Sequence, residues 1–365
     1  MTRAGTTRVF RRLLVGGALA LGVIVLLGVV FRGPIALRIM QTVVERNLST
    51  DPIAGLSDGL HVMLCGSGGP LASPNRSGPC VAVLAGKRLF VVDAGSGGAR
   101  NLTLGGLPPA LVEAVFLTHF HSDHIDGLGE LQLQRWPAGS HETPLVVYGP
   151  TGVEDVVAGF NLAYQQDAAY RVAHHGADAV PPSGAGMVAH PFAPPTAGRS
   201  LSVLDEGGLR VVAFDVDHEP ANPAVGYRFD YGGRSVLISG DTSKSAELAR
   251  NAKGVDLLVH EALAPRLMAV PTAAARVAGR DNLAKITLDV LDYHATPVEA
   301  AEIAEAAGVG HLLYYHIVPP LPLPGLESLF VEGVSDAYSG PVTVGRDRTM
   351  VSLASGSESI ELSNR

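Results

Sequence analysis

The stretch FLTHFHSDHIDGL at residues 116–128 decides the fold of this chain. Within it, three histidines and one aspartate fall inside six positions, directly after the apolar run AVFLT at residues 114–118. Imidazole nitrogens and carboxylate oxygens are donors that Zn²⁺ and Mn²⁺ accept. A loop that leaves a buried strand can point His119 and His121 at one ion and turn Asp123 and His124 to a second. The stretch therefore predicts a metal site at the end of a strand.

Short β-rich runs on both sides of this stretch alternate with helical runs. LHVMLCG, PCVAVLAG and KRLFVVDAG predict three strands separated by Gly, Pro and Ser turns. Two further runs flank Gly232-Gly233 and predict a hairpin. The remaining strands are expected at residues 114–118, 144–148, 209–216, 255–260 and 311–316. This alternation in both halves of the chain predicts a layered α/β protein with two packed sheets.

The helix signal is clearest at residues 297–307. Thr296 precedes it as the N-cap, Pro297 stands at its first position, and Glu299 completes a capping box. Gly308 follows the last apolar residue and ends the helix. We therefore expect this helix to begin and end within a residue of these signals.

The composition excludes several classes of protein. With 47% hydrophobic residues, the chain of 365 residues has enough apolar surface to fold, which excludes a disordered protein. Two cysteines are too few for a cysteine-based zinc framework. Cys65 and Cys80 could pair in an oxidising compartment, but burial as two small apolar side chains is favoured. The formal net charge of −8 predicts that nucleic acid is an unlikely partner, because nucleic-acid binders need a basic surface.

An uncharged run at residues 13–31 predicts a membrane anchor. As a helix, LLVGGALALGVIVLLGVVF would rise about 28 Å, which is roughly the thickness of a bilayer core. Arg8, Arg11 and Arg12 precede it and predict a cytoplasmic N-terminus. We therefore expect a basic cytoplasmic tail at 1–12 and an uncleaved transmembrane signal anchor at 13–31. The folded domain that follows is then extracytoplasmic, either periplasmic or extracellular, and it is secreted if the segment is cleaved.

The other domain boundaries follow from composition. We expect a linker or stalk at 32–58, one folded domain at 59–355 and a C-terminal tail at 356–365. Within the domain, residues 163–205 are rich in Pro, Gly and Ala and show weak periodicity. This segment is expected to be an insertion over the site.

FLTHFHSDHIDGL resembles the signature of the metallo-β-lactamase superfamily, and the resemblance extends from about residue 61 to residue 353. The segments GSGGP, VVDAGSG, DHEPANPAVGYR, SGDTS, LVHEAL, HATPVEAAEIAEAAGVGHLLYYH and VGRDR occur in the family's order. They are similar to the branch that ribonuclease Z shares with the bacterial zinc arylsulfatases, and FLTHFHSDHIDGLGELQLQRW leans towards the arylsulfatases. The resemblance implies a four-layer αββα sandwich, here preceded by the expected transmembrane helix.

The resemblance also implies a set of metal ligands. The implied cofactors are two Zn²⁺ ions, with Mn²⁺ as an alternative. One ion would be held by His119, His121 and His218, the second by Asp123, His124 and His316, and both would be bridged by Asp241. Taken alone, His218 could be a surface residue and Asp241 a helix N-cap, so these two assignments depend on the resemblance.

Three residues are implied to act in catalysis. Asp123 is a catalytic ligand. His294 would lie near the metals and donate a proton or a hydrogen bond to the reacting group. Glu261 would orient His294. An ordinary hydrogen-bonded histidine at a helix entry is the alternative for His294.

The implied reaction is hydrolysis of an anionic ester. Two zinc ions lower the pKa of a shared water, and a net site charge of about +1 attracts an anion. We therefore expect an ester-bond hydrolase (class EC 3.1) that resembles arylsulfatases or phosphodiesterases, with a small anionic ester as its partner and a homodimer left open. An apolar pocket beside His294, walled by Trp136, Tyr164 and Tyr170, would fit an aryl ester.

Three alternatives stay open. The first is a ribonuclease Z-type tRNA 3′ endoribonuclease, which shares nearly all the metal motifs. The second is a lactonase or β-lactamase-like hydrolase, and the third is a non-catalytic, membrane-anchored binding protein. A basic arm would favour the first, and loss of the metals would favour the third.

Overall fold

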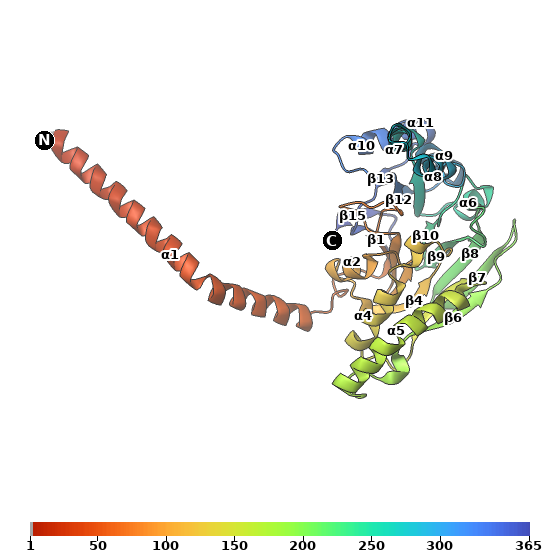
Figure 1. Ribbon diagram of the computed structural model, residues 1–365, viewed down its shortest axis with the longest axis horizontal. Helices are drawn as coiled ribbons and strands as arrows, with labels where there is room; N and C mark the ends of the chain where they lie inside the picture. Colours follow the sequence, from red (N-terminus) through yellow and green to blue (C-terminus); the bar gives the residue numbers. More distant parts are fainter. Residues whose placement is uncertain (1–2) are drawn as a thin grey trace. The chain divides into compact units, whose positions relative to one another are not determined.

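The computed structural model describes residues 3–365, except for the side chains of residues 3–12, 19–20, 23–27 and 30. The chain divides into two units, Met1–Gly55 and Leu56–Arg365. The first unit contains α1 (Arg3–Ser49), the long helix that begins the chain in Figure 1.

The expected membrane anchor falls within α1. Among the residues that the structure describes, none of the helices is both long enough and apolar enough to cross a membrane. Part of the run at 13–31 lies outside the described side chains, so only short apolar stretches of it are described. The described residues therefore give no support to the predicted transmembrane helix, and the predictions of the membrane as a partner and of a periplasmic or extracellular domain, which depended on that helix, are corrected.

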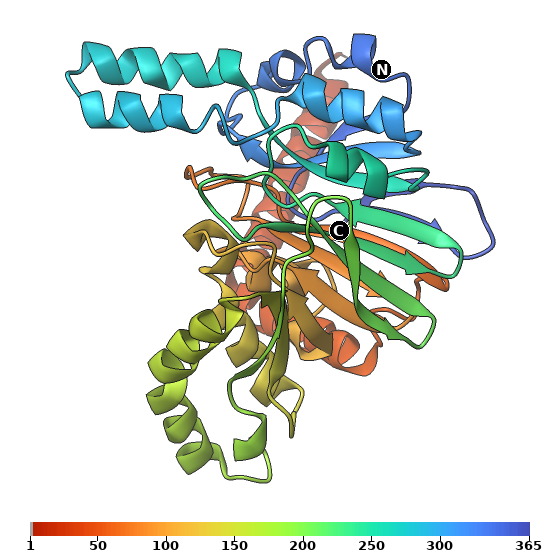
Figure 2. The same ribbon diagram turned by 90° about the vertical axis from the view of Figure 1, so that its right-hand side faces the viewer.

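Two β-sheets form the second unit (Figure 2). The first has the strand order β15-β14-β1-β2-β3-β4-β5-β6 and the second β13-β12-β11-β10-β9-β8-β7. The strands of the first sheet are β1 (Gly59–Gly66), β2 (Cys80–Ala85), β3 (Arg88–Val92), β4 (Val112–Phe116), β5 (Leu145–Pro150), β6 (Met187–Phe192), β14 (Thr349–Ala354) and β15 (Glu361–Asn364). Those of the second are β7 (Ser200–Glu206), β8 (Leu209–Asp215), β9 (Val225–Tyr231), β10 (Arg234–Ile238), β11 (Leu257–Leu263), β12 (His311–Val318) and β13 (Val342–Val344).

Helices contact both sheets. The helices on the first sheet are α2 (Gly98–Leu104), α4 (Leu128–Ala138) and α5 (Val153–His175), and those on the second are α6 (Ala246–Asn251) and α9 (Pro297–Ala307). The other helical segments are η1 (Pro109–Leu111), α3 (Ser122–Ile125), η2 (Pro182–Gly184), α7 (Pro265–Val277), α8 (Asp281–Asp289), α10 (Leu326–Phe330) and α11 (Val334–Ala337). The arrangement confirms the predicted α/β sandwich.

The main core lies between the sheets and fixes the start of the histidine loop. Phe116, the last residue of β4, is fully buried and stacks on Tyr148 with 4.8 Å between the ring centroids. The rings of Tyr227 and Phe229 meet Phe116 edge-on from the second sheet. Aromatic pairs of this kind stabilise a core beyond the area they bury. The loop after Phe116 therefore begins at a rigid point.

The segments expected to be an insertion (163–205) and a C-terminal tail (356–365) contribute strands to the sheets. Much of 163–205 belongs to α5, β6 and β7, because β6 pairs with β5 and β7 pairs with β8 at the sheet edges. Within the expected tail at 356–365, residues 361–364 form β15 and pair with β14. Both segments thus extend the sheets.

The structure also differs from the favoured interpretation of the two cysteines, which was burial without pairing. Cys65 and Cys80 form a disulfide, with 4.9 Å between their Cα atoms. Both lie where β1 pairs with β2, next to a shift in the strand register. This pairing places the two sulfur atoms together.

Candidate metal centre

The predicted site residues come from the ends of neighbouring strands. His119, His121, Asp123 and His124 follow β4, His218 follows β8, and Asp241 follows β10. Glu261 lies in β11 and His316 in β12, and β10, β11 and β12 are parallel neighbours. Because parallel strands end at the same edge of a sheet, their terminal side chains are brought together.

The structure places all seven predicted metal ligands in two adjoining groups. The candidate ligand atoms of His119, His121, His218 and Asp241 lie within 4.8 Å of one another, and so do those of Asp123, His124 and His316. The Asp241 carboxylate lies between the groups. Its Oδ2 is 3.2 Å from the Nε2 atoms of both His124 and His316, and 3.8 Å from Nε2 of His218.

The buried polar atoms at this centre fit a cation. Nδ1 of His121 lies 3.0 Å from Nε2 of His119 and 3.3 Å from Nε2 of His218, so ring nitrogens face one another. Oδ1 of Asp241 and Nδ1 of His316 are buried without a hydrogen-bond partner. Buried polar atoms are rarely left unpaired, and this donor set is one that zinc accepts.

Neighbouring groups hold the rings so that their other nitrogens point inward. Nδ1 of His124 is 2.8 Å from Oδ2 of Asp93, and Nδ1 of His218 is 2.9 Å from the carbonyl oxygen of Tyr293. Asp93 also accepts hydrogen bonds from the backbone and the hydroxyl of Thr118. Such partners orient the histidines of metal sites. Asp93 is absent from the predicted site, although its place in VVDAGSG at the end of an apolar strand was a signal for it.

The glycine-rich loop GSGGP packs directly on His316. A Cβ atom added to Gly69 would lie 3.0 Å from Cε1 of His316 and 2.8 Å from Cγ2 of Val318. The loop is tied down because Asp347 accepts hydrogen bonds from the backbone and the hydroxyl of Ser67. The absence of a side chain at Gly69 therefore lets this loop support the ring of His316.

The electrostatics keep most of these groups in the protonation state that binds a cation. Burial lowers the pKa of His119 and His218, so their rings stay neutral. Burial opposes ionisation of Asp241, but His316 and His124 outweigh it and hold the pKa of that carboxyl well below its usual range. For His124 the effect of burial is also outweighed, and the carboxylates of Asp241 and Asp93 raise its pKa.

His294 and Glu261 form a pair beside this centre. Nδ1 of His294 lies 3.1 Å from Oε1 of Glu261, which also accepts a hydrogen bond from the backbone of Ala295. Burial lowers the pKa of His294, but the charge and the hydrogen bond of Glu261 outweigh it and raise that pKa to about 9. The ring is close to two candidate ligands, with centroids 5.2 Å from His218 and 5.4 Å from His316. The pair can therefore hold a proton next to the centre.

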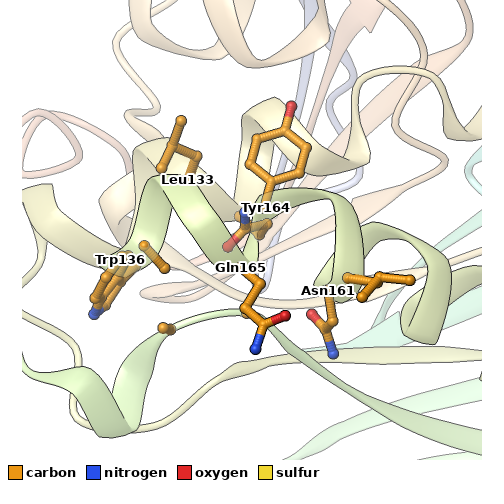
Figure 3. A pocket seen from close by; sticks show the side chains of 10 residues that line it. Leu133, Trp136, Asn161, Tyr164 and Gln165 are labelled. Atoms are coloured by element: carbon orange, nitrogen blue, oxygen red, sulfur yellow. The ribbon is translucent and has the colours of Figure 1, made fainter. Parts of the chain in front are cut away.

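A cavity of about 200 Å³ lies beside the centre. His294 and several candidate ligands line one wall of it, and the opposite wall is apolar. The predicted wall of Trp136, Tyr164 and Tyr170 is wrong. Trp136 and Tyr164 line a separate cavity of about 470 Å³ with residues of α4 and α5 (Figure 3), and Tyr170 lines neither. The apolar wall beside His294 comes instead from the segment between Glu261 and His294, together with Pro70, Leu71 and Val318.

Residues 74–279 match the family model described as the Metallo-beta-lactamase superfamily. The chain belongs to the metallo-beta-lactamase superfamily. A relative in this superfamily is "Ribonuclease Z" of Mycolicibacterium paratuberculosis, 34% identical over 291 residues that cover 79% of this chain and 96% of that protein. Superfamily membership and this relative indicate a metal-dependent hydrolase.

Solved structures show the same fold. Human tRNase Z, short form, has a TM-score of 0.57 and 22% identity, covering 80% of this chain and 98% of that chain. The metallo-beta-lactamase fold protein YhfI from Bacillus subtilis has a TM-score of 0.56 and 20% identity, covering 80% and 99%.

These relatives contradict the prediction that nucleic acid is an unlikely partner, since the sequence relative is named as a ribonuclease. That prediction rested on the net charge of −8. A net charge sums the whole surface, whereas cations bound at one site can attract a phosphate locally. The same relatives give no support to the arylsulfatase side of the resemblance.

Proposed function

We propose that the chain is a ribonuclease Z-type endoribonuclease that hydrolyses a phosphodiester bond near the 3′ end of an RNA. The observation that carries this proposal is the convergence of the two ligand groups beside the His294–Glu261 pair. The relatives named ribonuclease Z support RNA as the substrate.

In this proposal, His119, His121 and His218 would hold one zinc ion, and Asp123, His124 and His316 would hold a second, with the Asp241 carboxylate available to both groups. Zinc bound there supplies Lewis acidity and activates a water for attack. Asp123 lines the cavity beside these groups, so its carboxylate is available to orient the attacking water.

His294 provides the proton for the leaving oxygen. Its Nδ1 is directed to Glu261, so Nε2 is the nitrogen free to donate to the substrate. Glu261 is fully buried and keeps the imidazolium charged near neutral pH. An acid of this kind contributes about 10²–10⁴-fold to a rate.

The test is cleavage of a tRNA that carries a 3′ extension by the full chain supplied with zinc. We expect one cut near the 3′ end of the mature tRNA, and we expect the cut to be lost in His121→Ala together with bound metal. His141→Ala is the matched control, because His141 bonds the carbonyl oxygen of Ala110 and belongs to neither ligand group. An intact RNA after incubation with zinc-loaded protein would contradict the proposal.

A second candidate is a hydrolase of small aryl sulfates or phosphates. The apolar wall of the cavity beside His294 favours it, because such a wall suits an aryl group. Nitrophenyl sulfate and bis(nitrophenyl) phosphate test this candidate. Turnover of the sulfate without cleavage of the RNA would replace the first candidate with the second.

A further inference from the structure

A helical hairpin separates the two residues of the proposed acid pair. α7 and α8 lie side by side and project from the sandwich (Figure 2). The chain enters α7 just after Glu261 and leaves α8 just before His294. Thr272 of α7 donates a hydrogen bond of 2.9 Å to the hydroxyl of Thr287 in α8, and both residues are buried. This bond holds the two helices of the hairpin together.

One wall of the cavity at the metal centre is built largely by this hairpin. Met268, which is 1% exposed, packs with Leu263 and Val318 at the base of the hairpin. Leu283 and Ile286 of α8 line the same cavity, and Ile286 is 56% exposed. An isoleucine left open to solvent beside a catalytic centre is available to contact a ligand.

The opposite wall carries the polar groups. His121, Asp123 and Asp241 line it together with His294 and His316. On the hairpin itself, the hydroxyl of Thr287 is already bonded to Thr272 and to backbone carbonyls within α8. The phenol of Tyr293, which follows α8, also lines the cavity. Among the described residues, the lining side chains of α7 and α8 therefore offer a ligand apolar surface and no free hydrogen-bond donor.

The size of the cavity limits what can enter. Its volume is about 200 Å³. An apolar cavity of roughly 150 Å³ binds benzene. One aromatic ring fits against the hairpin while the charged ester group lies against the polar wall.

We propose that the α7–α8 hairpin is a specificity element that packs against one aromatic ring of the substrate, and that in RNA this ring is the nucleobase next to the scissile phosphate. The inference rests on the proposed function and deepens it. Because the contact is apolar packing, the subsite accepts a base without selecting which base.

Two phosphodiesters with the same leaving group test the subsite. Bis(4-nitrophenyl) phosphate carries a second ring, and ethyl 4-nitrophenyl phosphate carries an ethyl group in its place. The measured quantity is kcat/KM for bis(4-nitrophenyl) phosphate divided by kcat/KM for ethyl 4-nitrophenyl phosphate. We expect Ile286→Ala to lower this ratio by about 10-fold, which is the range for a lost apolar contact in a pocket. Leu283→Ala gives a second measurement at a half-buried position.

Val277→Ala is the matched control on the same hairpin. Val277 is 93% exposed and does not line the cavity, so the ratio should stay as in the unaltered chain. Unaltered ratios in both Ile286→Ala and Leu283→Ala overturn the subsite. Absence of any diester or RNA cleavage by the unaltered chain refutes the proposed function instead.

An RNA with one abasic ribose beside the scissile bond tests whether the subsite is occupied by a nucleobase or only by the aryl leaving group of a nitrophenyl ester. We expect the unaltered chain to cut this RNA about 10-fold more slowly than the intact RNA. We expect Ile286→Ala to reduce that difference. Equal cutting of both RNAs by the unaltered chain contradicts the nucleobase as the occupant.

Discussion

Replacing Glu261 with glutamine tests whether this residue holds the proton on His294. The side chain is fully buried, and its Oε1 accepts from His294 at 3.1 Å and from the backbone of Ala295 at 3.0 Å. Glutamine keeps the shape and one accepting oxygen but removes the negative charge. The pKa of His294, raised to about 9 by Glu261, should then fall towards its ordinary value near 6.5.

The size of the effect depends on pH. At pH 8, a histidine with a pKa of about 9 is roughly nine-tenths protonated, whereas one with a pKa of about 6.5 is protonated to a few per cent. If the imidazolium donates the proton, kcat/KM of Glu261→Gln at pH 8 falls roughly 30-fold. At pH 6 most of the histidine is protonated in both proteins, so the loss there is less than about twofold.

The assay is the pH dependence of kcat/KM for bis(4-nitrophenyl) phosphate from pH 5.5 to 9.5 at fixed zinc. Glu299→Gln is the control, because Glu299 belongs to the capping box of α9 and bonds Thr296. An equal loss at pH 6 and pH 8 in Glu261→Gln would refute the reasoning, since it would make Glu261 a structural residue only.

Four other changes have expected outcomes. Asp93→Ala removes the partner of His124 and should weaken metal affinity by about 10–100-fold in a zinc titration, whereas an unchanged affinity would deny Asp93 this role. Gly69→Ala should displace His316 and lower the zinc content measured by elemental analysis, and full zinc content would show that the loop yields instead. Replacing both cysteines with alanine opens a loop of 15 residues and should cost about 3 kcal/mol in urea unfolding; no loss of stability would contradict this. In chelated protein, the stabilisation from His294 is complete below pH 6.5 and is lost as the pH rises through about 9, so His294→Gln should flatten the fall in unfolding free energy across that window.

The sequence predicted the parts of the fold that have strong local signals. The helix at 297–307 is confirmed with Thr296 as its N-cap, the capping box with Glu299, and Gly308 in the left-handed conformation. The strands at the centre of the sandwich are also confirmed. They could be predicted because burial on both faces makes them continuous apolar runs, as in β1 and β12.

The edge strands and the tail were harder to predict. β6 and β7 are mostly exposed or half-buried, so their sequences lack a clear alternation of apolar and polar residues. β15 is exposed along its whole length and is held by its pairing with β14. Such pairing depends on where the partner strand lies, which local sequence does not encode.

The site depended on long-range convergence. The motif at 116–128 predicts metal binding by itself, but His218, Asp241 and His316 were assigned to the site through the resemblance. Asp93 and Gly69 were missed because their roles depend on contacts with His124 and His316. The apolar wall was assigned to the wrong aromatic residues, since nothing local indicates that the α7–α8 hairpin lies beside His294.

The metal content of the purified protein tests the central claim most directly. After dialysis against zinc and removal of the excess, elemental analysis should give about two metal ions per chain, and treatment with a strong chelator should remove the ions and the phosphodiesterase activity together. A chain that retains no metal yet cleaves the diester at full rate in the chelator would contradict it.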